Sequence, residues 1–310
     1  MNRDEILHRV KEALARNGFH YQDFSDTNSC FDLIARKSEN VLVLKVLSNI
    51  DALRPEHARD LKKMAIVFHG HSMIVGEKSK VFTLDEHVLY DRYHLPVLSL
   101  SGFDRSLQSK FPTQRAYKGQ RVVELDAQRL KSERSARELT LKELSERAGV
   151  SMESLHRYET GAPALADVAQ KLEKILHTRL VQHINVFESA PITVEEINQP
   201  VSPAVLEQLE AIGMKFSVFE RAPLTAAAME QDLLVTHVTH AHHLKRKAGY
   251  LAQATAITHV PGVLISSEEK ATHAEGIPVV SESELSTFST AKDMIQTLHE
   301  RRKHKNETKH

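Results

Sequence analysis

The stretch that decides the fold is LTLKELSERAGVSMESLHRYETG, residues 139–161. Thr140 is followed three residues later by Glu143, the spacing of a capping box at a helix start. Gly149 permits the tight turn that ends this helix, and Ser151 is placed to cap the next one. The pattern therefore predicts a helix, a short turn and a second capped helix.

The second predicted helix has an apolar side and a polar side. Leu155 and Tyr158 are expected to face the core, because they are three residues apart on one helical face. The side chains expected to point outward are those of Met152, Glu153, His156 and Arg157. A capped helix whose N-terminal side chains are free has the geometry that enters a DNA major groove.

Residues 126–176 resemble the Cro/lambda-repressor-like helix-turn-helix family. The resemblance rests on the Ala-Gly-Val-Ser turn at 148–151, the Leu-x-x-Tyr-Glu-x-Gly ending at 155–161 and the helical pattern that follows. It implies a five-helix bundle in which 151–158 is the recognition helix. The DNA-binding residues implied are Lys142, Ser151, Met152, Glu153, Ser154, His156 and Arg157. A bundle used for protein contact is the alternative reading, and the polar outer side chains oppose it.

Charge limits what this bundle does alone. Residues 126–180 contain ten Lys or Arg and nine Asp or Glu, so the segment gains little from releasing DNA counterions. The preceding segment, 105–121, has five basic residues and no acid. It is expected to be a linker or small hairpin that supplies weak phosphate contacts through Arg115, Lys118 and Arg121. A merely solvated connector remains the alternative.

An α/β unit is predicted on each side of the bundle. The run VLVLKVL, residues 41–47, is almost wholly apolar, which is typical of a strand buried on both faces. Its residues 42–46 are matched by 234–238, at an offset of 192. Leu95-Pro96-Val97 likewise has a counterpart in Ile277-Pro278-Val279. The recurring order of elements favours an internal duplication.

The first α/β unit resembles the restriction-endonuclease-like fold. In that fold an acid on one strand, and an acid two residues before a lysine on the next, hold Mg²⁺ and its water. Asp32 and Lys45 fit this layout, but the position two before Lys45 is Val43. The matching residues of the second unit are Leu224, Val235 and His237. Both units are therefore expected to be inert, without metal or cofactor. Glu39 is the candidate for a substitute acid if the first unit is active.

Composition sets the remaining bounds. The 310 residues carry 41 basic and 41 acidic side chains, so bulk charge does not hold the protein to nucleic acid. The single cysteine, Cys30, cannot form an intramolecular disulfide, which favours a reducing cytoplasm, and it is expected to be a small core residue. No apolar run approaches the roughly 18 residues of a membrane span. A histidine cluster (His237, His240, His242 and His243) suggests metal binding, but solvated or capping histidines are favoured.

The expected fold is multidomain α/β plus all-α, with two endonuclease-like α/β units flanking the five-helix bundle. The expected parts are 1–104, the first α/β domain; 105–125, the basic linker or hairpin; 126–183, the helix-turn-helix domain; 184–300, the second α/β domain; and 301–310, a basic tail. This layout resembles a family of archaeal HTH-type transcriptional regulators.

The resemblance implies a sequence-specific regulator, not an enzyme, that binds double-stranded DNA. One recognition helix reads few base pairs, so a homodimer on an inverted repeat is expected. A small-molecule effector stays unidentified. The alternative is a nuclease guided by the helix-turn-helix and using Asp32 and Lys45.

Overall fold

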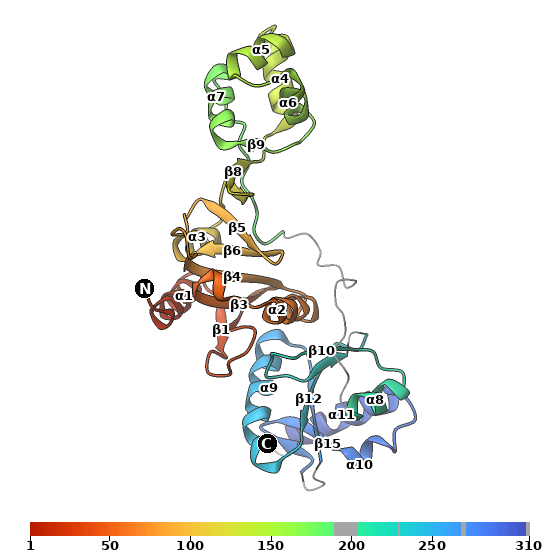
Figure 1. Ribbon diagram of the computed structural model, residues 1–310. Helices are drawn as coiled ribbons and strands as arrows, with labels where there is room; N and C mark the ends of the chain where they lie inside the picture. Colours follow the sequence, from red (N-terminus) through yellow and green to blue (C-terminus); the bar gives the residue numbers. More distant parts are fainter. Residues whose placement is uncertain (189–203, 229, 268–270, 308–310) are drawn as a thin grey trace. The chain divides into compact units, whose positions relative to one another are not determined.

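The computed structural model describes residues 1–188, 204–228, 230–267 and 271–307 (Figure 1). The chain divides into two compact units, each assembled from separate chain segments. The first contains residues 1–13, 47–52 and 74–190, and the second contains residues 14–46, 53–73 and 191–310. No helix among the described residues is long and apolar enough to cross a membrane.

The first unit contains six strands in the order β4-β6-β5-β7-β8-β9. Their bounds are β4 (His71–Lys78), β5 (Val88–Arg92), β6 (Leu95–Ser99), β7 (Gln114–Tyr117), β8 (Gln120–Val123) and β9 (Ala164–Leu165). The helices that begin in this unit are α1 (Arg3–Arg16), η1 (Ile50–Ala52), α3 (Leu100–Leu107), α4 (Ala127–Ala136), α5 (Leu141–Ala148), α6 (Met152–Glu159) and α7 (Ala166–Leu176).

Strands β7 and β8 form a hairpin within residues 114–123. Tyr117 pairs with Gln120, so the turn has two residues. These are Lys118, with a φ of 48°, and Gly119, with a φ of 79°. Two consecutive positive φ angles are the signature of the type I′ turn, whose twist matches that of antiparallel strands. The basic segment is thus an ordered hairpin, and its second strand also pairs with β9.

Helices α4, α5, α6 and α7 cluster around one core (Figure 1). Leu130, Leu144, Leu155, Leu172 and Leu176 are among its buried residues. The expected five helices are corrected to four, because residues 126–183 contain only these α-helices.

The expected fifth helix is replaced by strand β9. Gly161 has a φ of 98°, which ends the preceding helix. Pro163 disfavours helical backbone at the residue before it. The next two residues pair with β8, through Val122 with Leu165 and Val123 with Ala164.

The second unit contains the antiparallel strands β1, β2 and β3 and a six-stranded sheet in the order β10-β11-β12-β13-β15-β14. The strand bounds are β1 (His20–Asp23), β2 (Leu33–Lys37), β3 (Asn40–Asn49), β10 (Phe216–Val218), β11 (Ala226–Ala228), β12 (Leu233–Val238), β13 (Gly262–Ser266), β14 (His273–Ala274) and β15 (Ile277–Ser281). The helices are α2 (Pro55–Val67), α8 (Ala204–Ala211), η3 (Ala241–His243), α9 (Leu244–Thr258), α10 (Glu282–Leu285) and α11 (Ala291–Glu307).

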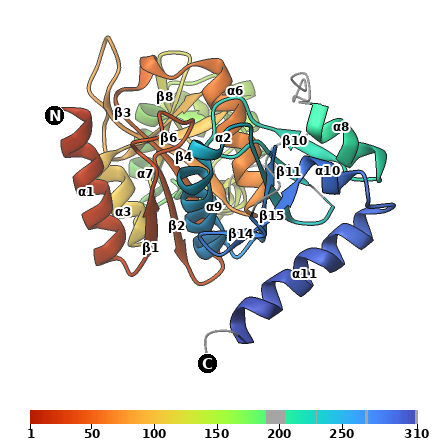
Figure 2. The same ribbon diagram turned by 90° about the horizontal axis from the view of Figure 1, so that it is seen from below.

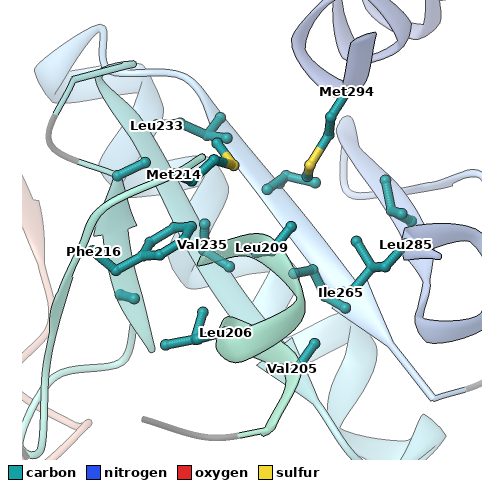
Figure 3. Packing of buried hydrophobic residues seen from close by; sticks show 14 of the residues in the cluster. Val205, Leu206, Leu209, Met214, Phe216, Leu233, Val235, Ile265, Leu285 and Met294 are labelled. Carbon is teal, nitrogen blue, oxygen red and sulfur yellow. The ribbon is translucent and has the colours of Figure 1, made fainter. Parts of the chain in front are cut away.

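Both faces of the six-stranded sheet are covered. On one face Leu206 of α8, Leu285 of α10 and Met294 of α11 pack against Val235 and Ile265 (Figure 3). Helix α9 contacts β12 and β13. Strands covered on both faces read as continuous apolar runs, which explains the sequence of β12 and β13.

The same strand pairing recurs in both halves of the chain. Ala35 pairs with Leu42 across β2 and β3, and Ala227 pairs with Leu234 across β11 and β12, each 192 residues later. The antiparallel pairs β5/β6 and β14/β15 also match, at an offset of 182: Arg92 pairs with Leu95, and Ala274 pairs with Ile277. A matching register is more specific than a shared order of elements, so these pairings support descent of both halves from one repeated unit.

The expected basic tail differs from the structure. Residues 301–307 continue α11, a continuous helix in Figure 2, and residues 308–310 lie outside the described residues. Arg301 pairs with Glu284 and donates to the Val279 carbonyl. Arg302 donates to the Gly262 carbonyl at 2.9 Å. These bonds to β15, α10 and β13 hold two basic side chains of the segment that was expected to be a basic tail.

Candidate nucleic-acid interface

Helix α5 begins and ends as its sequence predicts. The Thr140 N–H donates to Glu143 Oε2 at 2.7 Å, and the Glu143 N–H donates to Thr140 Oγ1 at 3.2 Å, which completes the capping box. The hydrogen bonds that the Thr140 N–H and the Thr140 hydroxyl donate to Glu143 Oε2 lower the pKa of this carboxyl. Gly149 ends the helix in the left-handed region, with a φ of 72°. The turn can therefore pass directly into α6.

Helix α6 is anchored on one side and exposed on the other. Leu155 is fully buried, and Tyr158 packs partly buried against the same core. The exposed side chains are those of Ser151, Met152, Glu153, His156 and Arg157. Met152 is 53% exposed, so its apolar side chain faces solvent instead of the bundle core. The helix therefore presents a mixed apolar, acidic and basic surface.

Two of the predicted DNA-binding residues also have structural roles. Ser151 caps α6, because its Oγ accepts from the Ser154 N–H at 3.1 Å. The two hydroxyl oxygens lie 2.9 Å apart, and Ser154 is half-buried. Lys142 is exposed near the start of α5.

An ion pair that the sequence reading missed fixes the end of α6 against α4. Arg134 Nε donates to Glu159 Oε1 at 2.6 Å, and its Nη2 donates to Oε2 at 3.1 Å. A further Nη donates to the Leu139 carbonyl at 2.8 Å. The hydrogen bonds from Arg134 to Glu159 raise the pKa of the guanidinium. Only their opposite charges signalled the pair in the sequence, because the two residues lie 25 positions apart on different helices.

The basic hairpin is less positive than its composition suggests. Arg115 lies 3.6 Å from Glu124, and Arg121 lies 2.9 Å from Asp85. The His87 N–H and the Arg121 guanidinium lower the pKa of the Asp85 carboxyl. Lys118, at the tip, lies 5.2 Å from the centre of the Tyr117 ring. Two of the three predicted phosphate contacts thus have carboxylate neighbours in the free protein.

Asp32 and Lys45 form an ion pair, so their charges neutralise each other. Lys45 Nζ lies 3.1 Å from Asp32 Oδ1 and 2.7 Å from the Ser29 carbonyl oxygen. Asp32 Oδ2 accepts from the Val46 N–H at 2.6 Å. Both side chains are buried. An aspartate held in this way has both oxygens occupied by the protein itself.

Glu39 is wrongly placed to replace the missing acid. It lies in the β2–β3 turn, its side chain is 96% exposed, and it sits 3.5 Å from Arg36. Lys45 lies six positions further along the extended chain, a span of about 20 Å. Val43, at the position of the second ligand, is fully buried.

The histidines of the second unit and Cys30 are the remaining residues that the sequence singled out. His237, the counterpart of Lys45, hydrogen-bonds Glu282 at 2.7 Å. The rings of His242 and His243 lie 3.9 Å apart at the start of α9. Among the described residues no group of three or more His, Cys, Asp or Glu could hold a metal ion. Cys30 is fully buried, and burial raises the pKa of its thiol, as befits a core residue.

Comparison with known proteins assigns both motifs to families. Residues 3–112 match the model of a PD-(D/E)XK superfamily domain, and residues 127–176 match that of a helix-turn-helix domain. No solved structure matches the chain.

Full-length relatives occur in archaea. The chain is 31% identical to a Methanocaldococcus jannaschii protein, covering 87% of this chain and 88% of that one. It is 30% identical to a Methanothermobacter thermautotrophicus protein, covering 97% and 98%. An Archaeoglobus fulgidus protein is 29% identical, covering 96% and 97%. Each relative is named "Putative HTH-type transcriptional regulatory protein".

Proposed function

Since the chain belongs to the family of archaeal HTH-type transcriptional regulatory proteins, we propose that it reads the DNA major groove with helix α6. The observation that carries the proposal is the two-sidedness of this helix. Leu155 is fully buried in the bundle core, while His156 and Arg157 beside it are exposed. A helix held by its apolar side and free on its polar side meets the geometric demand of major-groove recognition.

The exposed side chains suggest distinct roles at the DNA. Arg157 offers a guanidinium, the strongest donor for a guanine edge. His156 and Glu153 can bond other base edges, and Met152 can contact a thymine methyl group. Ser151 and Ser154, already bonded to each other, are better suited to phosphate contact than to base reading.

Phosphate contacts complete the proposed interface. Lys142 near the start of α5 is exposed and would add a contact that is independent of sequence. Lys118, at the hairpin tip, is the best placed of the three hairpin residues, because Arg115 and Arg121 already have carboxylate neighbours. Exposed ion pairs contribute only about 0–1 kcal/mol each, so DNA phosphates could displace them.

We further propose that the protein acts as a homodimer on an inverted repeat. A single α6 contacts only a few base pairs, and two-fold pairing doubles the sequence that is read. The proposed DNA-binding domain spans 126–183. In the sequence, the hairpin segment 105–125 joins it to the α/β segment 1–104, and the α/β segment 184–300 follows it. These segments would serve dimerisation, DNA-backbone contact or effector sensing.

The PD-(D/E)XK domain is proposed to be catalytically inert. Hydrolysis in this fold needs two carboxylates that hold Mg²⁺ and activate water. Asp32 is bonded to Lys45 and to the backbone, and Val43 offers no ligand. The second candidate function, a nuclease that uses Asp32 and Lys45, is favoured by the PD-(D/E)XK match and by the meeting of these two residues.

Competition binding of the Lys142→Ala variant tests the proposal that Lys142 contacts phosphate while α6 reads the bases. The variant should weaken binding to all duplexes by a similar factor and reduce the salt dependence by about one phosphate contact. Lys131→Ala, which removes an exposed lysine from α4, is the matched control. Unchanged affinity of Lys142→Ala for every duplex would contradict the proposed placement of α5.

A further inference from the structure

A cavity of about 340 Å³ lies in the first unit between β5, the loop that precedes it and the β7–β8 hairpin. Its volume is at the lower end of the roughly 300–1,000 Å³ typical of small-molecule sites. The proposed recognition helix does not use this cavity, because α4–α7 contribute none of its lining residues, and the proposed phosphate contact Lys118 is shared between the two. It is therefore a separate candidate site.

One wall of the cavity is aromatic. Phe82 and Tyr90 stack with ring centres 5.5 Å apart and planes inclined by 22°. Tyr90 is buried and fixed, because its hydroxyl accepts from the Asp85 N–H at 3.0 Å. Phe82 is 46% exposed. A half-exposed phenylalanine ring stacked on a fixed tyrosine offers a surface on which a planar group can stack.

The polar lining is mostly cationic. Arg92, Lys118 and Arg121 line the cavity, against one carboxylate, Asp91. Arg121 is held by Asp85, outside the lining. The guanidinium of Arg92 contacts Asp51 through Nη2, but its Nε is buried and has no hydrogen-bond partner among the described residues. A buried donor without an acceptor is costly, so an anionic oxygen that reaches this guanidinium from the cavity would be stabilising.

The arginine is not required by the strand pairing. Arg92 pairs with Leu95 across β5 and β6, and the equivalent residue in the second repeat, which pairs with Ile277, is Ala274. The same turn is thus built with an alanine at this position. The strand pairing therefore does not account for Arg92, whose guanidinium contacts Asp51 and lines the cavity.

We propose that this cavity binds a small planar aromatic ligand that carries a phosphate or carboxylate group. The ring stacks on the exposed part of Phe82, and the anionic oxygens accept hydrogen bonds from the Arg92 guanidinium and from the Lys118 ammonium. Lys118 lies on the hairpin whose second strand pairs with β9 of the helical bundle. The ligand thus contacts a segment that continues directly into the bundle.

The absence of tryptophan makes a sharp test possible. Phe82→Trp places the only indole of the chain at the cavity wall, and its emission is followed while ligand is added. The probes are adenosine monophosphate, benzoate, adenosine and inorganic phosphate. We expect a saturable change with at least one of the first two, and binding roughly tenfold weaker with adenosine or phosphate alone.

Two further variants make the result specific. Lys118→Ala in the Phe82→Trp background should weaken binding about tenfold. Tyr93→Trp, an exposed aromatic position that does not line the cavity, should show no saturable change. Calorimetry of the unmodified protein with the same probes guards against an effect of the new indole.

Three outcomes would overturn the proposal. The first is no saturable binding of either aromatic anion, by emission or calorimetry, up to millimolar concentrations. The second is equal affinity before and after Lys118→Ala. The third is binding of single-stranded oligonucleotides without binding of the mononucleotide, which would make the surface part of a nucleic-acid groove.

Discussion

Arg134 of α4 and Glu159 at the end of α6 form a bidentate ion pair, with N–O distances of 2.6 and 3.1 Å. Their side chains are only 13% and 5% exposed. The pair therefore fixes the C-terminal end of α6 against the rest of the bundle. This contact and the buried Leu155 together determine the orientation of the exposed N-terminal part of α6.

Removal of Arg134 should destabilise the bundle. Arg134→Met leaves Glu159 buried without its partner, so we expect a loss of about 3–5 kcal/mol in the free energy of unfolding. The double variant Arg134→Met/Glu159→Leu should regain part of this loss, because no buried charge remains. Denaturant unfolding monitored by helical circular dichroism measures both. Arg129→Ala, an exposed arginine of the same helix, is the control and should change stability by no more than about 0.5 kcal/mol. Equal effects of Arg134→Met and Arg129→Ala would contradict the role assigned to the pair.

No cleavage of single-stranded, double-stranded or branched DNA is expected with Mg²⁺ or Mn²⁺. The same reasoning predicts that Lys45→Ala is destabilised by about 3–5 kcal/mol, because Asp32 stays buried without its cation. His237→Ala at the matching position of the second repeat should cost less, since its partner Glu282 is 42% exposed. Metal-dependent DNA cleavage that disappears in Lys45→Ala would refute the prediction that the PD-(D/E)XK domain is catalytically inert.

Asp51 should make stability depend on pH in the acid range. The Lys80 N–H, followed by Arg92, lowers the pKa of this carboxyl below its ordinary value. A lowered native pKa means that Asp51 stabilises the fold above the ordinary pKa of about 3.9, and that this contribution is lost as the pH falls through the native pKa. Asp51→Asn should thus be less stable than the unmodified protein at about pH 7, with the difference shrinking toward about pH 3. A difference that stays constant over this range would rule out the assigned role.

The sequence predicted the helix-turn-helix well, because its signals are local. Thr140, Glu143, Gly149 and Ser151 each specify a cap or turn within four residues of themselves. The repeat was also visible, since a strand covered on both faces leaves a long apolar run in the sequence. The local pattern failed after Gly161, where pairing with β8 overrode the helical spacing of the apolar residues.

Long-range polar contacts could not be predicted. Lys63 donates to the Val218 carbonyl, and Asp60 accepts from the N–H groups of Glu220 and Arg221, about 160 positions later in the chain. The same holds for Arg121 with Asp85, which reduced the expected positive face of the hairpin. Such pairs depend on tertiary packing, and neither partner is distinguished by its neighbours in the sequence.

A homodimer is expected both free and on DNA. Light scattering at micromolar concentration should give twice the mass of the 35.0 kDa chain. On a duplex with two half-sites about 34 Å apart, the complex should contain two chains. A monomer in both states would refute the proposed two-fold arrangement.

Selection of bound sequences from random duplex DNA tests the central claim, that exposed side chains of α6 read sequence. The unmodified protein should enrich an inverted repeat with half-site centres about 10 base pairs apart. Arg157→Ala should lose roughly 1–3 kcal/mol on that repeat and relax the preference at one position of each half-site. Arg179→Ala, an exposed arginine beyond α7, should select the same repeat as the unmodified protein. No enriched motif, or an identical motif and affinity for Arg157→Ala, would contradict the account.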